Sequence, residues 1–97
     1  MVKSYELTVL FSPNSTSDVL QKLQDSVTKT ITSHGGKITK TDIWGRKLMA
    51  YRIKKFDEAF FVLYMLSVEA DKAQELERAV KLTDGVIRHL FVVAEEE

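Results

Sequence analysis

The sequence contains no cysteine, one proline and four glycines among its 97 residues. Without cysteine the chain can form neither a disulfide framework nor a thiolate metal site, and it has no cysteine nucleophile. Little proline and glycine, together with 44% hydrophobic and 29% charged residues, is typical of a compact folded protein rather than a disordered or fibrous segment. We therefore expect a single domain over residues 1–97.

Long apolar runs are also missing. None approaches the roughly 18 residues that a membrane helix needs. The first residues, Met1–Ser4, lead directly into an alternation of polar and apolar side chains rather than into the apolar segment of a signal peptide. These absences predict a cytoplasmic protein that does not associate with membranes.

The chain has no excess charge of either sign, because 14 basic residues balance 14 acidic ones. The charges are unevenly placed, however. Residues 37–55 carry seven basic side chains and the single acid Asp42, whereas the chain ends in three glutamates within a segment, 94–97, that we interpret as a solvated acidic tail. The basic middle is compatible with a merely solvated hairpin and with one positive edge that binds a polyanion.

Hydrophobic periodicity predicts six elements in the order strand, helix, strand, strand, helix, strand. An unbroken apolar run at 59–66 is typical of a central strand covered on both faces. The first helix begins with a capping box formed by Ser15 and Asp18 and ends at Gly35–Gly36. Its apolar stripe is Val19, Leu20, Leu23, Val27 and Ile31. The predicted strands are 4–11, 37–55, 59–66 and 86–93, with a turn at 55–58, and the second predicted helix spans 69–82.

This order of elements is the ferredoxin-like βαββαβ plan of an α+β fold. Right-handed crossovers place both helices on one face of a four-stranded antiparallel sheet. The strand at 37–55 then lies at an edge of the sheet, with a bulge or sharp twist expected at Gly45. The opposite face has no helix on it although its strands offer apolar side chains, so we expect another molecule to cover that face or an edge.

Residue patterns that would carry chemistry are missing as well. His34 and His89 have no second ligand at a metal-binding spacing, and Gly35–Gly36 follows a helix instead of opening one as a phosphate loop does. Asp57 and Glu58 fall in an expected turn, where solvent keeps both carboxylates ionised. We predict no catalytic residue, no metal, no cofactor and no small-molecule substrate, and hence a protein that is not an enzyme.

The segment from Trp44 to Tyr51 differs from the rest, because two aromatic rings and the basic pair Arg46–Lys47 share a predicted edge strand. An edge strand keeps unpaired amides and carbonyls that another chain can use. In a simpler interpretation the rings cover the core and the charges prevent self-association. The two interpretations are compatible, since charges that forbid pairing with a second copy can accept a complementary partner.

Five motifs occur together in this chain. They are Tyr5–Glu6 at the first strand, Pro13–Asn14 before the first helix, the block WGRKLMAYRIKK at 44–55, the aromatic strand at 59–66 and the ending DGVIR at 84–88. In combination they resemble the bacterial small-subunit ribosomal protein S6 family over residues 5–93. Family members usually have a second arginine where this chain has Lys47 and a proline where it has Arg52. Lys47 would therefore offer a phosphate one ammonium contact rather than a bidentate fork.

The resemblance implies a non-enzymatic protein of the small ribosomal subunit that pairs with ribosomal protein S18 and, as a heterodimer, binds small-subunit (16S-type) ribosomal RNA. It implies that the protein partner contacts Trp44, Arg46, Lys47, Met49 and Tyr51. It also implies that RNA contacts Lys3, Tyr5, Lys81 and Arg88, the cations by neutralising phosphates and Tyr5 by stacking on an unpaired base or a ribose.

Two other functions are possible for the same fold. One is an RNA recognition motif, which Phe61–Tyr64 fits in part, although acids at Asp57 and Glu58 stand where that motif needs a basic residue. The other is a dimeric ferredoxin-like enzyme with Trp44 or His89 in a pocket between subunits. The sequence shows no acid, base and electrophile placed to act together, which speaks against the enzyme. Binding of single-stranded RNA would distinguish an RNA recognition motif from the ribosomal function.

Overall fold

The computed structural model describes residues 1–53 and 55–94, with no side-chain description for residue 53. The elements follow the predicted order, with one short 3-10 helix added. They are β1 (Val2–Phe11), α1 (Ser17–Ser33), β2 (Lys37–Ile53), β3 (Phe56–Glu69), η1 (Ala70–Lys72), α2 (Ala73–Lys81) and β4 (Val86–Val93). The acidic tail expected at 94–97 lies outside the described residues except for Ala94.

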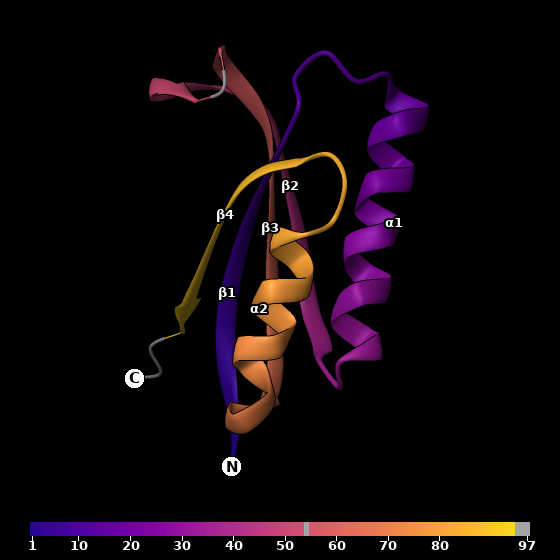
Figure 1. Cartoon of the computed structure of the whole chain (residues 1–97), viewed down its shortest axis with the longest axis vertical. Helices are drawn as coiled ribbons and strands as arrows, with labels where there is room; N and C mark the ends of the chain where they lie inside the picture. Colours follow the sequence, from indigo (N-terminus) through magenta and orange to yellow (C-terminus); the bar gives the residue numbers. More distant parts are fainter. Residues whose placement is uncertain (54, 95–97) are drawn as a thin grey trace.

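The four strands form one antiparallel sheet in the order β2-β3-β1-β4. β3 and β1 are the two inner strands, and β2 and β4 are the edges. Both helices lie side by side on the same face of the sheet, with α1 packed next to β2 and α2 next to β4 (Figure 1). The predicted ferredoxin-like α+β fold and the edge position of β2 are thereby confirmed.

The core fills the space between the sheet and the two helices. Alternate residues of β1 point into it, so that Leu7, Val9 and Phe11 are fully buried. The other fully buried hydrophobic side chains come from β3, α1 and α2, and include Val62, Tyr64, Leu66, Val27, Ile31, Leu76 and Val80. Burial of each side chain of this size contributes about 1.5–3 kcal/mol to folding. The buried side chains between the sheet and the helices therefore hold the two layers together.

The start of α1 differs from the prediction. Thr16, not Ser15, caps the helix: its hydroxyl accepts a hydrogen bond from the Val19 amide at 3.3 Å. The cap, and with it the start of the helix, therefore lies one residue later than expected, and Val19 points outward with 44% of its surface exposed. Gln24 is buried in its place on the inner side. Both hydroxyl residues can cap a helix, so the sequence alone did not separate them.

Two other boundaries are also different. β3 begins at Phe56, inside the predicted turn, because Phe56 still pairs with β2 and Asp57 is joined to Arg52 by an ion pair of 2.8 Å. At its other end β3 continues to Glu69, which pairs with Val2, and the predicted second helix starts only after that point. Within the described residues, no helix is long and apolar enough to cross a membrane.

Tyr64 makes the stability of this core sensitive to alkaline pH. Its ring is fully buried, and its hydroxyl donates to the Gln24 carbonyl oxygen at 3.4 Å. Burial raises the pKa of Tyr64 from 10.0 to about 12. A raised pKa of this phenol means that its contribution to stability is complete below pH 10 and is lost as the pH rises toward 12.

We expect the free energy of unfolding of the wild-type chain to fall by about 2 kcal/mol more between pH 10 and pH 12 than that of Tyr64→Phe. Urea unfolding at several pH values, followed by circular dichroism, measures this difference. Parallel pH profiles for the two proteins would contradict it.

Candidate protein and RNA interfaces

The face of the sheet turned away from the helices, called the open face below, combines apolar and basic side chains. Directly paired residues share a face, and Leu10 lies between Phe61 on β3 and Arg88 on β4. The same alternation places Leu63, Met65 and Leu90 on this face. Leu90 is 50% exposed. Neither α1 nor α2 covers this face, as the sequence predicted.

A bulge in β2 builds an aromatic cluster at one border of the open face. Gly45 has a φ of +80°, and the register shifts between Ile43 and Gly45, so that Trp44 and Gly45 both lie opposite Phe61. The Trp44 ring stacks on Phe61 with centroids 6.3 Å apart. Its Nε1 donates to the Asp42 carboxylate at 3.3 Å, and the Lys47 Nζ lies 5.1 Å from the ring centroid.

The far end of the β2–β3 hairpin bends over the open face. The register of β2 against β3 shifts by several residues between Leu48 and Ile53, and this part of the hairpin turns away from α1 (Figure 1). As a result Tyr51 reaches Arg88 on the opposite edge strand. The bend forms one wall of an open pocket of about 260 Å³ lined by Leu10, Leu48, Met49, Ala50, Tyr51, Phe61, Arg88 and Leu90.

This bend corrects one expectation. The face opposite the helices is not bare along its whole length, because the chain's own hairpin covers part of it, and Leu10 is only 4% exposed there. The interior glycine Gly45 predicted the first bulge of β2, but no residue pattern indicated the second register shift, between Leu48 and Ile53.

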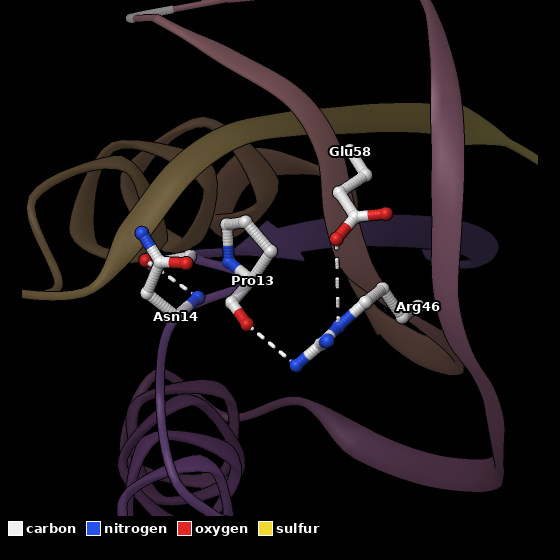
Figure 2. A network of polar contacts seen from close by, with 5 residues as sticks. Pro13, Asn14, Arg46 and Glu58 are labelled. Carbon is white, nitrogen blue, oxygen red and sulfur yellow. Dashed lines mark hydrogen bonds and ion pairs between the residues drawn. The ribbon is translucent and has the colours of Figure 1, made fainter.

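Arg46 plays a different part from its neighbours on β2. Its guanidinium donates to the Pro13 carbonyl oxygen at 2.6 Å, and its Nε lies 3.8 Å from a Glu58 carboxylate oxygen. Figure 2 shows the side chain between the β1–α1 loop and the base of the β2–β3 hairpin. Arg46 thus ties that loop to the hairpin. The remaining predicted partner residues, Trp44, Lys47, Met49 and Tyr51, gather on or beside the open face.

The predicted RNA contacts do not form one cluster. Lys81 and Arg88 come together in a depression of about 340 Å³ at the β4 edge, which Val86, Ile87 and His89 also line. Lys3 lies at the other end of the sheet, in a depression beside Val93 and Ala94. Arg88 pairs with Leu10, seven residues along β1 from Lys3, so about 23 Å of strand separates the two cations.

Tyr5 does not have the exposure that stacking on a base requires. Its side chain is 7% exposed, and its ring is stacked on Phe91 with centroids 4.7 Å apart. Tyr5 has the same parity as Leu7 and Val9, so it faces the helices with them. We therefore correct the expected stacking role, because this ring belongs to the core.

Sequence reasoning missed a group of polar residues between α2 and β4. His89 lies 3.0 Å from the Glu77 carboxylate, and both line a groove of about 250 Å³ with Gln74, Arg78 and Lys81. Arg78 precedes Lys81 by three residues on α2, a spacing that puts both cations on one side of a helix and could have revealed them. Among residues 1–53 and 55–94, no three histidine, aspartate or glutamate side chains are grouped so as to hold a metal ion.

Comparison with known proteins relates this arrangement to one family. The family model described as ribosomal protein S6 matches residues 4–93. The small ribosomal subunit protein bS6 of Heliobacterium modesticaldum is 38% identical over 99% of this chain and 100% of its own length, and that of Clostridioides difficile is 39% identical over 96% and 100%.

Solved structures agree with this relationship. The crystal structure of 30S ribosomal protein S6 from Thermotoga maritima superposes with a TM-score of 0.88 at 28% identity, covering 97% of this chain and 89% of that one. The C-terminal domain of the MgtC protein from Mycobacterium tuberculosis shares the fold alone, with a TM-score of 0.64 at 12% identity. Because the family model and the relatives span nearly the whole chain, this protein belongs to the ribosomal protein S6 family of the small ribosomal subunit.

Proposed function

We propose that this small-subunit protein acts without catalysis, by pairing with ribosomal protein S18 and binding small-subunit ribosomal RNA as a heterodimer. The observation that carries the proposal is the continuity of an edge strand, β2, with the exposed aromatic and basic side chains of the open face. The names of the relatives, all proteins of the small ribosomal subunit, support the same function.

The partner surface in this proposal consists of Trp44, Lys47, Met49 and Tyr51. Trp44 and Tyr51 are 43% and 59% exposed, and partly exposed aromatic rings of this kind are the usual anchors of protein interfaces. β2 also keeps one side of its backbone available for pairing. Arg46 contributes indirectly, since it holds the Pro13 loop against the hairpin on which the anchors stand.

The RNA surface in this proposal is centred on Lys81 and Arg88 at the β4 edge, with Arg78 beside them and Lys3 as a separate contact. Each cation that meets a phosphate releases counterions, which supplies affinity that falls with added salt. Four such contacts on a chain of zero net charge give weak binding. A basic partner would supply the remaining electrostatic attraction.

The test is a titration of a transcript of the 16S-type central domain with this chain alone, with S18 alone and with both together. We expect weak binding by the chain alone, and binding by the heterodimer that is at least about a hundredfold tighter than by either protein alone. Equal RNA affinity with and without S18 would overturn the proposal.

A further inference from the structure

Tyr51 and Arg88 form a contact that bridges the two edges of the sheet. Tyr51 belongs to β2 and Arg88 to β4, with β3 and β1 between them. Strands in a sheet lie about 4.8 Å apart, so only the bend of the hairpin allows these side chains to meet. Arg88 donates a hydrogen bond to the Tyr51 hydroxyl, and its Cζ lies 5.5 Å from the centroid of the Tyr51 ring.

The contact holds the Arg88 guanidinium in place without neutralising it. The phenol is an uncharged acceptor, and none of the ion pairs among residues 1–53 and 55–94 involves Arg88. Arg88 also lines both the pocket under the hairpin and the depression that contains Lys81. A fixed cation that keeps its charge and further donors is suited to binding a phosphate, because less side-chain entropy is lost on contact.

We propose that Tyr51 is a positioning residue for the RNA contact of Arg88, which rests on the function proposed above. Its hydroxyl and ring fix the guanidinium at the mouth of the pocket. Tyr51 also stands among the partner-binding residues, so one side chain touches both interfaces. Binding of the protein partner and binding of RNA are then coupled through this pair, and the coupling acts equally in both directions.

A double-mutant cycle on the complete heterodimer tests this role. The RNA affinities of wild type, Tyr51→Phe, Arg88→Gln and the double variant are measured with S18 saturating each. Tyr51→Phe keeps the ring and removes only the hydroxyl acceptor. We expect it to weaken RNA binding about fivefold in the wild-type background, whereas in the Arg88→Gln background it changes the affinity by less than about 1.5-fold.

A second readout uses the full chain without RNA or partner. Hydrogen exchange of the Arg88 Nη1–H, the group that donates to the Tyr51 hydroxyl, is followed by NMR and is expected to be several-fold faster in Tyr51→Phe than in wild type. The matched control is Tyr64→Phe, which removes a tyrosine hydroxyl on the other side of the sheet. The control should leave RNA affinity and Arg88 exchange unchanged.

The outcomes separate this inference from the proposed function. A heterodimer that binds RNA, with equal effects of Tyr51→Phe in both backgrounds or with no effect in either, overturns the positioning role and leaves the proposed function standing. A Tyr51→Phe chain that no longer pairs with S18 also overturns it, since Tyr51 would then act through the partner alone. A wild-type heterodimer that binds no RNA overturns both.

Discussion

Trp44→Ala is expected to weaken the binding of ribosomal protein S18 about thirtyfold while leaving the fold intact. The ring is 43% exposed and contacts its own chain through Phe61, Asp42 and Lys47, all at the border of the open face. An interface anchor of this kind contributes about 2 kcal/mol to binding. The stability cost should be below about 1 kcal/mol, because the ring lies outside the core. Isothermal titration with S18 and urea unfolding measure the two effects.

Val19→Ala is the matched control for this experiment. Val19 is 44% exposed, close to the exposure of Trp44, but it projects from α1 on the opposite side of the sheet. S18 affinity should be unchanged in this variant. Trp44→Phe should recover part of the lost affinity, since it restores an aromatic surface. An unchanged affinity in Trp44→Ala would show that the partner binds elsewhere.

The double substitution Lys81→Ala, Arg88→Ala is expected to lower the RNA affinity of the heterodimer roughly thirtyfold, or about 2 kcal/mol. The two cations share one depression at the β4 edge, so both can meet the same stretch of backbone. The plot of log Kd against log salt should become shallower by about 1.5, because two phosphate contacts are lost. Filter binding at four salt concentrations measures both quantities.

Lys29→Ala provides the control, because Lys29 is an exposed cation on α1, away from the β4 edge. It changes the net charge by one without touching the proposed RNA surface. If Lys29→Ala lowered the RNA affinity and its salt dependence as much as the loss of one cation at the β4 edge, the binding would reflect the overall charge of the protein rather than a defined site. Each single variant, Lys81→Ala or Arg88→Ala, should lose about half of the binding free energy that the double variant loses.

The order of elements and the edge position of β2 could be predicted because they depend on patterns that one sequence contains. The period of two in β1 and the apolar run of β3 determine which strands lie inside the sheet. Boundaries were less predictable. Ser15 and Thr16 are both suitable caps, and only the structure shows that Thr16 caps the helix. Asp57 and Glu58 are typical turn residues, and only the pairing of β3 with β2 shows that they belong to a strand.

The sequence predicted which segment carries the partner surface, but not how the side chains of that segment are arranged in space. Sequence reasoning brought Trp44 and Tyr51 together with Arg46, whereas the structure turns Arg46 toward Pro13 and sends Tyr51 across the sheet to Arg88. The bulge at Gly45 was expected from that glycine, whereas the register shift between Leu48 and Ile53, next to Tyr51, had no such signal in the sequence. Tyr5 was assigned to RNA from the family resemblance, although its parity with Leu7 already indicated the core.

Family membership confirms the expected place of the chain, the small ribosomal subunit in the cytoplasm. Within that setting, the proposed function assigns the β2 border and the open face to a protein partner and the β4 edge to RNA, while the helices pack on the core.

Amide hydrogen exchange of this chain, measured free and bound to S18, shows whether β2 and the open face form the partner surface. Exchange is expected to slow in β2 around 41–51 and in the neighbouring open-face strands, while α1 exchanges as before. Slowed exchange confined to α1 and α2, with β2 unchanged, would contradict this expectation.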